Sequence, residues 1–323
     1  TMQVMPKIFF EFLTVIVLSG LILLLSFSDK ASAEIVSVLG VFAMSAFKLL
    51  PSIARLITNI QAFRFAMPVV DIIEKELMLE LIDPHKQIFS KLKYEDNIVL
   101  NNISFLYESS ERSALKNINL NIKAGQTIGF IGSSGAGKST LIDIILGLLT
   151  PSKGQILVDS QLINEANLKA WQKKIGYVSQ SIYLLDDTFR RNIAFGLPDE
   201  DIDEEKIKNA IKLAQLDEFI TSLPDKLETF VGEAGVRISG GQRQRIGIAR
   251  ALYNDPDILV LDEATSALDI DTELDVMKSI RSLHGQKTIL IIAHRLSTVK
   301  NCDYVYKLDN GSIIQSGLPD EVL

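Results

Sequence analysis

The chain has little cysteine, little histidine and no excess of positive charge. Cys302 is the only cysteine among 323 residues, which excludes an internal disulfide. The three histidines form no cluster with the spacing of metal ligands. A formal net charge of -7 argues against a protein that coats phosphate backbones, because such binding needs Lys and Arg to neutralise phosphates. We therefore expect no nucleic acid among its partners, and a reducing cytosol suits the bulk of the chain.

Repeats and low-complexity tracts are also lacking, but the composition changes sharply along the chain. Residues 8–27 form an apolar run whose only charge is Glu11, and its length matches a bilayer-spanning helix. A signal peptide with Lys7 before the apolar run is the alternative, although no clean cleavage site follows. A second apolar stretch, residues 35–47, continues at helical spacing. We predict two spanning helices, at about 8–27 and 35–60.

The basic residues indicate how these helices are oriented. Lys48, Arg55 and Arg64 lie beyond the second span, whereas the short connection between the spans holds two acidic residues and one basic residue. The positive-inside bias places the far end of the second span in the cytoplasm. We expect a multi-pass protein of the inner (plasma) membrane whose remaining residues, after the second span, are cytoplasmic.

A different pattern follows the helices. Residues 87–96 are polar and lack periodicity, so we place a linker there, between a transmembrane part (1–86) and a second domain (97–323). In the second domain short apolar strands alternate with amphipathic helices, which predicts an α/β fold with a largely parallel sheet. Asn310-Gly311 between two strand-like runs predicts a hairpin. The acidic run 199–205 predicts a helix start.

A glycine-rich loop follows the predicted strand Thr127 to Ile131 and precedes a helix-like apolar run. Its glycines allow the backbone N–H groups to surround phosphates, and the helix adds the positive end of its dipole. Lys138 is expected to bind the β- and γ-phosphates, and Ser139 to bind Mg²⁺. We assign the whole loop to nucleotide binding: Gly132, Ser133, Ser134, Gly135, Ala136, Gly137, Lys138, Ser139 and Thr140.

An acidic pair ends another apolar strand, ILVLDE, at residues 258–263. Asp262 is expected to hold Mg²⁺ through water, and Glu263 to polarise the attacking water as a general base. Such a run by itself is more often an ordinary strand followed by a loop. The phosphate-binding loop upstream favours the functional interpretation.

A second helix start suited to phosphate lies in ISGGQRQRIGIARAL, residues 238–252. Here Ser239, Gly240, Gly241 and Gln242 come just before an amphipathic helix, and a loop merely capped by Ser239 is the structural alternative. With this segment the region from about Asn97 onward resembles ATP-binding cassette (ABC) proteins, whose signature is SGGQ. The resemblance implies a RecA-like parallel-sheet core with antiparallel β and helical subdomains, and hydrolysis of ATP with Mg²⁺.

The resemblance further implies that two such domains pack head to tail, so that Ser239 and Gly241 contact a γ-phosphate held by the partner. Four more positions match the family in order. Gln180, in YVSQ, resembles the residue that touches Mg²⁺ or the water, and His294, in IIAHRLS, resembles the switch histidine. Asp269, in SALD, resembles the interface loop, and Tyr107 resembles the aromatic residue on which adenine stacks. Without the family pattern these would be solvated polar residues, a cap and a packed aromatic residue.

The order of the parts, membrane helices first and ATPase second, resembles ABC exporters, as does VGEAG at residues 231–235. The resemblance implies a second half-transporter as partner, most simply an identical chain. One hairpin cannot surround a translocation path and the first residue is Thr1, so we expect a fragment. PKIFFEF and AFKLLPS resemble bacterial flippases of lipid-linked oligosaccharides, which implies a lipid-linked oligosaccharide or related glycolipid as cargo, with membrane lipid as a further partner. Exporters of peptides, proteins or drugs, and a soluble non-transport ABC ATPase, remain alternatives.

Overall fold

The computed structural model describes residues 5–27, 32–78, 92–108, 110, 112–232, 235–236, 238–263, 270–293 and 295–323. The chain divides into two compact units, Thr1–His85 and Lys86–Leu323. Of the expected linker, residues 87–91 lie outside the described part.

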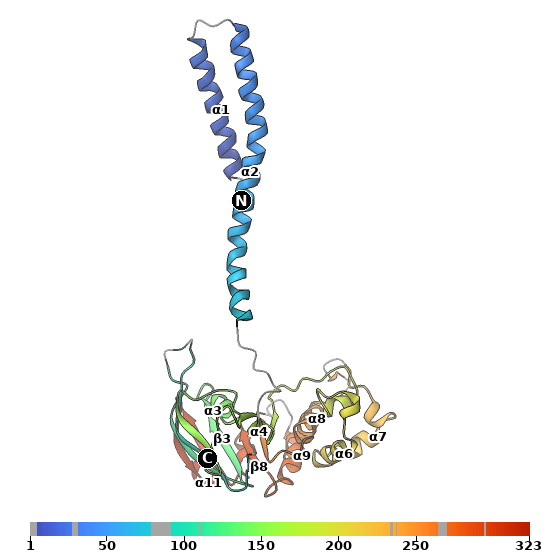
Figure 1. Cartoon of the computed structure of the whole chain (residues 1–323). Helices are drawn as coiled ribbons and strands as arrows, with labels where there is room; N and C mark the ends of the chain where they lie inside the picture. Colours follow the sequence, from blue (N-terminus) through green and yellow to red (C-terminus); the bar gives the residue numbers. More distant parts are fainter. Residues whose placement is uncertain are drawn as a thin grey trace. The chain divides into compact units, whose positions relative to one another are not determined.

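The first unit is helical. It consists of α1 (Met5–Ser26) and α2 (Ser32–Leu77), which contact each other (Figure 1). Among the described residues one helix is long and apolar enough to cross a membrane, at Val36–Leu77, while the apolar segment of α1, Phe12–Leu24, is shorter. Helix α2 continues past residue 60, where the second span was expected to end, because residues 61–77 remain rich in helix-forming types.

The second unit is built around a six-stranded sheet of order β10-β9-β3-β8-β7-β6. Five of its strands are parallel, and only β10 runs antiparallel to its neighbour. Central strand β3 is buried along almost its whole length, as expected for a parallel sheet covered on both faces. The strands are β3 (Thr127–Gly132), β6 (Ile175–Val178), β7 (Ile258–Asp262), β8 (Thr288–Ile292), β9 (Tyr304–Asp309) and β10 (Ser312–Gly317).

A second, four-stranded antiparallel sheet packs against the first, in the order β2-β1-β4-β5. Its buried residues Ile98 and Leu100 share one hydrophobic cluster with Phe130 of β3 and with Trp171. This shared core joins the two sheets. The strands are β1 (Asn97–Phe105), β2 (Leu115–Lys123), β4 (Lys153–Val158) and β5 (Gln161–Leu162).

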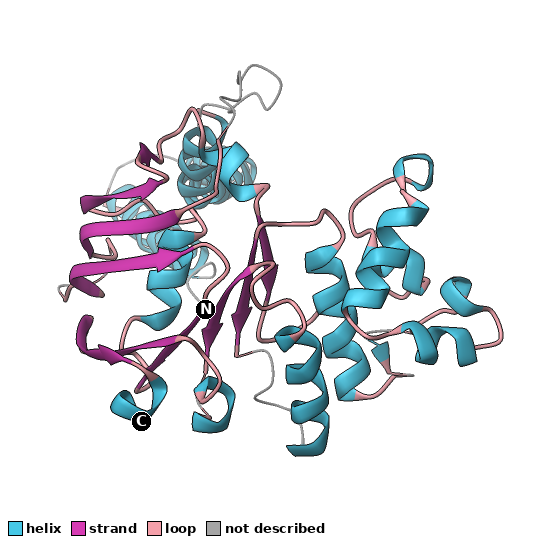
Figure 2. Ribbon diagram, turned by 90° about the horizontal axis from the view of Figure 1, so that it is seen from below, coloured by secondary structure: helices cyan, strands magenta, loops and turns pink. Residues whose placement is uncertain are grey.

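Helices form the other side of this unit, where α6, α7 and α8 lie together (Figures 1 and 2). The acidic run begins a helix as predicted, because the Asp203 side chain caps α6 by accepting from the N–H groups of Glu205 and Lys206. The described helices are α3 (Lys138–Ile145), α4 (Leu168–Gln172), α5 (Phe189–Ile193), α6 (Glu204–Leu213), α7 (Asp217–Ser222), α8 (Gly240–Leu252), α9 (Ile270–Arg281), α10 (Leu296–Val299) and α11 (Pro319–Val322).

The predicted hairpin joins β9 to β10. Asn310 and Gly311 have φ of 47° and 79°, the left-handed values that a tight two-residue turn requires, and Asp309 pairs with Ser312. The predicted fold class is confirmed: a parallel-sheet core carries an antiparallel β part and a helical part, and an apolar helical region precedes them.

Candidate nucleotide-binding site

The glycine-rich loop lies between the end of β3 and the start of α3. Gly132 has a φ of 150°, and a Cβ placed there would lie 2.2 Å from the carbonyl oxygen of Leu308. Gly137 has a φ of 100°, and its Cβ would lie 2.7 Å from the carbonyl oxygen of Ala114. At Gly135, with a φ of 77°, nothing lies within 4 Å. Close backbone contacts therefore require two of the glycines, and backbone conformation alone requires the third.

Lys138, the first residue of α3, is only 5% exposed. Its Nζ donates hydrogen bonds to the carbonyl oxygens of Gly132 at 2.9 Å and Ser133 at 3.0 Å. Burial lowers the pKa of Lys138, and the nearby carboxylates of Glu263 and Asp262 act in the opposite direction. The ammonium group thus lies over its own loop, where an anionic ligand would compensate its desolvation.

A cavity of about 300 Å³ opens above the loop. Tyr107 lies at one side, where its hydroxyl is 3.1 Å from Oγ1 of Thr140 and its ring packs edge-to-face on Phe105. Gly137 occupies the N-cap position of α3 and offers no side-chain acceptor to the first N–H groups of the helix. The cavity brings together Tyr107, Ala114, Ser134, Gly135, Gly137, Lys138, Ser139, Thr140 and Glu263.

The acidic pair lies at the carboxyl end of β7. Glu263 has a φ of 48° in the left-handed region, and its N–H donates to the carbonyl oxygen of Ile292 at 3.1 Å. Nε2 of Gln180 donates to Oε2 of Glu263 at 2.8 Å. Asp262 ends β7 and lies close enough for its charge to act on Lys138. The structure therefore groups Gln180, Asp262 and Glu263, although 83 residues separate Gln180 from Glu263.

Two residues that sequence reasoning missed belong to this group. Tyr177, on β6, donates its phenol hydrogen to Oδ2 of Asp262 at 3.0 Å. Burial and the charge of Asp262 raise the pKa of Asp143, on α3. Asp143 follows Ser139 by four positions, so helical spacing places both on one face, a signal that the sequence did contain. For Tyr177 the signal was weaker, because it depends on β6 lying next to β7.

The segment of Ser239 to Gln242 forms the start of α8. Oγ of Ser239 accepts from the N–H of Gln242 at 3.2 Å, and Oε1 of Gln242 accepts from the N–H of Ser239 at 2.9 Å. This is a reciprocal capping box, so the structural alternative for Ser239 is realised. A hydroxyl accepts and donates at once, and Ser239 and Gly240 are exposed whereas Gly241 is buried. In Figure 1, α8 lies next to α6 and α7 and away from α3.

Residues 115–266 match the family model described as ABC transporter. Residues 115–266 are therefore an ABC transporter domain. The resemblance of the chain to ABC proteins and its predicted ATPase domain are thereby confirmed.

Individual relatives agree with this assignment. ATP-dependent lipid A-core flippases of Shewanella frigidimarina and Idiomarina loihiensis are 41% and 42% identical to this chain, over 249 and 227 residues respectively. These matches cover 77% and 70% of the chain, but only 41% and 39% of the flippases. The chain therefore spans about two fifths of these relatives. A solved structure of a bacterial Atm1-family ABC exporter with ATP bound is 28% identical, with a TM-score of 0.68, and covers 98% of this chain and 56% of that one.

Some expected positions of the ABC domain lie outside the described residues. These are His294 and Asp269, together with residues 233–234 of VGEAG. Within the described part no group of three or more His, Cys, Asp or Glu side chains is placed to hold a metal ion.

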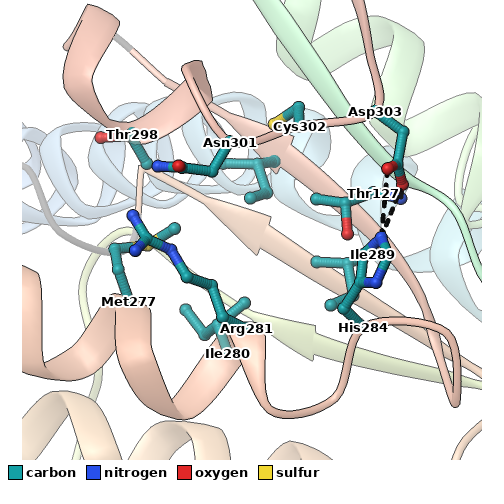
Figure 3. Close-up of a pocket in the computed structure, with 11 residues that line it drawn as sticks. Thr127, Met277, Ile280, Arg281, His284, Ile289, Thr298, Asn301, Cys302 and Asp303 are labelled. Carbon is teal, nitrogen blue, oxygen red and sulfur yellow. Dashed lines mark hydrogen bonds and ion pairs between the residues drawn. The ribbon is translucent and has the colours of Figure 1, made fainter.

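A further pocket of about 320 Å³ lies elsewhere, between the end of α9 and β8 (Figure 3). Here Nε2 of His284 lies 3.0 Å from Oδ2 of Asp303, and that oxygen also accepts from the N–H of Thr127 at 2.7 Å. Asp303 thus bridges His284, which follows α9, and Thr127 at the start of β3. Cys302 is buried beside this pocket, and burial raises the pKa of its thiol to about 12.

Proposed function

We propose that the chain is the ATP-hydrolysing part of a membrane exporter, with ATP bound in the cavity above the glycine-rich loop. The single observation that carries this is the convergence of Lys138, Tyr107 and Glu263 on that cavity. The adenine ring would stack on Tyr107, whose ring is 40% exposed, and the phosphates would lie on the N–H groups of the loop and on Lys138. Lys138→Ala should weaken ATP binding measured without metal; unchanged affinity would contradict the assignment.

For catalysis we propose Glu263 as the general base and Gln180 as the group that holds the water or the metal. Oxygen donors of Ser139, Asp262 and Gln180 would hold Mg²⁺, and these are the ligand types that Mg²⁺ prefers. When bound, the ion would neutralise charge on the phosphates and orient them for in-line attack. Gln180 donates to Oε2 of Glu263 at 2.8 Å, and a carboxylate has further lone pairs with which it can accept a proton from water. His294 is proposed at the γ-phosphate.

We further propose that two copies of the chain close on each ATP head to tail. Ser239 is exposed, and its hydroxyl keeps a hydrogen to donate to a partner's γ-phosphate after it has capped α8. Gly240, Gly241 and Gln242 would approach with it, and Asp269 would cross the interface. The positive end of the helix dipole at the start of α8 adds to the attraction for phosphate.

A disulfide experiment tests this arrangement directly. The only native cysteine, Cys302, is 6% exposed, so a Ser134→Cys/Ser239→Cys chain offers two reactive thiols. Oxidation in the presence of ATP and Mg²⁺ should give a covalent dimer, and each single-cysteine chain serves as control. If the double-cysteine chain stays monomeric with ATP, the head-to-tail arrangement is wrong.

The cargo we propose is a lipid-linked oligosaccharide or a related glycolipid. Relatives about 40% identical carry the name lipid A-core flippase, which denotes a glycolipid cargo for those proteins. Large apolar side chains along α2, such as Phe47 and Phe63, are exposed and would contact lipid. We accordingly propose spans at about 8–27 and 35–60 in the inner membrane, with the domain after the 87–96 linker in the cytoplasm.

Two measurements separate the alternatives for the cargo and the location. In liposomes, ATP hydrolysis should rise with added glycolipid and stay constant with peptides or drugs; the reverse response would favour a peptide or drug exporter. Extraction of membranes with alkaline carbonate should leave the chain in the pellet. Release into the wash would favour a soluble non-transport ATPase.

A further inference from the structure

Tyr177 lies on the edge strand of the six-stranded sheet. Strand β6 pairs in parallel with β7, and Tyr177 is opposite Val260 in the register. The phenol group reaches toward the carboxyl end of β7, where it donates to Oδ2 of Asp262 at 3.0 Å. This hydrogen bond thus connects two strands that are distant in the sequence. It does so at Asp262, which the proposed function assigns to metal binding.

The carboxylate of Asp262 lies near a second carboxylate, that of Asp143. Burial, and then the charge of Asp262, raise the pKa of Asp143 on α3, which shows that the two acidic groups are close. Two neighbouring carboxylates require donors or a cation to remain ionised together. Tyr177 provides one donor, through the hydrogen bond of 3.0 Å from its phenol group to Oδ2 of Asp262.

We infer that Tyr177 is a positioning residue, which fixes the orientation of the Asp262 carboxylate before Mg²⁺ binds. The inference rests on the proposed function, since it takes Asp262 to serve the metal. Hydrogen-bond partners that hold metal-binding side chains typically change metal affinity by about 10–100-fold. The Tyr177 side chain is 41% exposed, so water replaces part of the lost bond, and the lower end of that range is expected.

The test measures Mn²⁺, in place of Mg²⁺, by electron paramagnetic resonance on the full chain saturated with a non-hydrolysable ATP analogue. Tyr177→Phe keeps the ring and removes the hydroxyl, and it should raise the dissociation constant of Mn²⁺ by about tenfold. Binding of the analogue in EDTA should stay unchanged. Tyr306→Phe is the control, because that hydroxyl donates to the backbone carbonyl of Asn121 at 3.2 Å, between β9 and β2 of the other sheet.

Asp262→Asn separates failure of the inference from failure of the proposed function. If Asp262→Asn weakens Mn²⁺ binding and Tyr177→Phe does not, the positioning role is overturned and the metal site stands. A lowered melting temperature of Tyr177→Phe with unchanged Mn²⁺ affinity would likewise overturn it, as a merely structural hydrogen bond. If neither variant changes Mn²⁺ affinity, the assignment of Asp262 to the metal is overturned as well.

Discussion

Gly132 and Gly135 form a matched pair in which the same substitution should have different consequences. An alanine Cβ at Gly132 would lie 2.2 Å from the carbonyl oxygen of Leu308, the residue with which Gly132 pairs across β3 and β9. The two strands would have to move apart by about 1 Å to relieve this contact. At Gly135 an alanine meets no atom within 4 Å, so only its φ of 77° is unfavourable.

These contacts determine how much folding stability each alanine variant is expected to lose. A side chain in the left-handed region costs about 1–2 kcal/mol, which applies to Gly135→Ala. Gly132→Ala adds overpacking against backbone, which typically costs about 1–3 kcal/mol more. For a domain of this size each 1 kcal/mol lowers the melting temperature by about 2–4 °C. Gly132→Ala should therefore melt about 2–12 °C below Gly135→Ala.

The only tryptophan provides the assay. Trp171 is fully buried in the second unit, and its Nε1 donates to the carbonyl oxygen of Ile145, at the end of α3, at 2.7 Å. Its fluorescence therefore reports on unfolding of the ATPase domain and not on the membrane helices. Equal melting temperatures for Gly132→Ala and Gly135→Ala, at one scan rate and without nucleotide, would refute the reasoning from the β3–β9 contact.

The remaining predictions concern the cap, the thiol and the metal. Ser239→Ala removes the cap of α8 and should lower the melting temperature by about 2–4 °C, whereas Ser239→Asp keeps a cap and should retain stability while ATP hydrolysis is lost. Equal activity in Ser239→Asp and wild type would contradict a phosphate contact. Because burial raises the pKa of Cys302 from 9.0 to about 12, its stabilising contribution is complete below pH 9 and is lost as the pH rises through 12. The wild type should therefore lose more stability than Cys302→Ala between pH 9 and 11, and parallel curves would contradict this. Chelation of divalent metal with EDTA should stop hydrolysis while ATP still binds, as measured by equilibrium dialysis.

The fold and the phosphate loop were predictable because their determinants are local. Gly132, Gly135 and Gly137 directly follow a strand and precede a helix, and the spacing alone indicates the loop. The hairpin at Asn310-Gly311 has the same character, since two adjacent residues with positive φ decide it. Alternation of strands and helices in turn indicated the parallel sheet that the structure contains.

Contacts across the sheet were not predictable in this way. The hydrogen bonds from Gln180 to Glu263 and from Tyr177 to Asp262 exist because β6 lies beside β7, and sheet order is not written in any local pattern. The bond between His284 and Asp303 depends in the same way on contact between the turn after α9 and the residue that precedes β9. The end of α2 at Leu77, beyond the expected span of residues 35–60, was not predictable, because an apolar pattern indicates a membrane segment and does not indicate where a helix ends in water.

Glu263→Gln is the substitution that tests the central claim most directly, because it keeps the size of the side chain and removes the base. The measurement is ATP bound and phosphate released by the same full-chain sample, with wild type alongside. ATP should bind as in the wild type, while turnover should fall by about 10²–10⁴-fold, the usual contribution of a general base. Turnover of Glu263→Gln within about twofold of wild type would contradict the account.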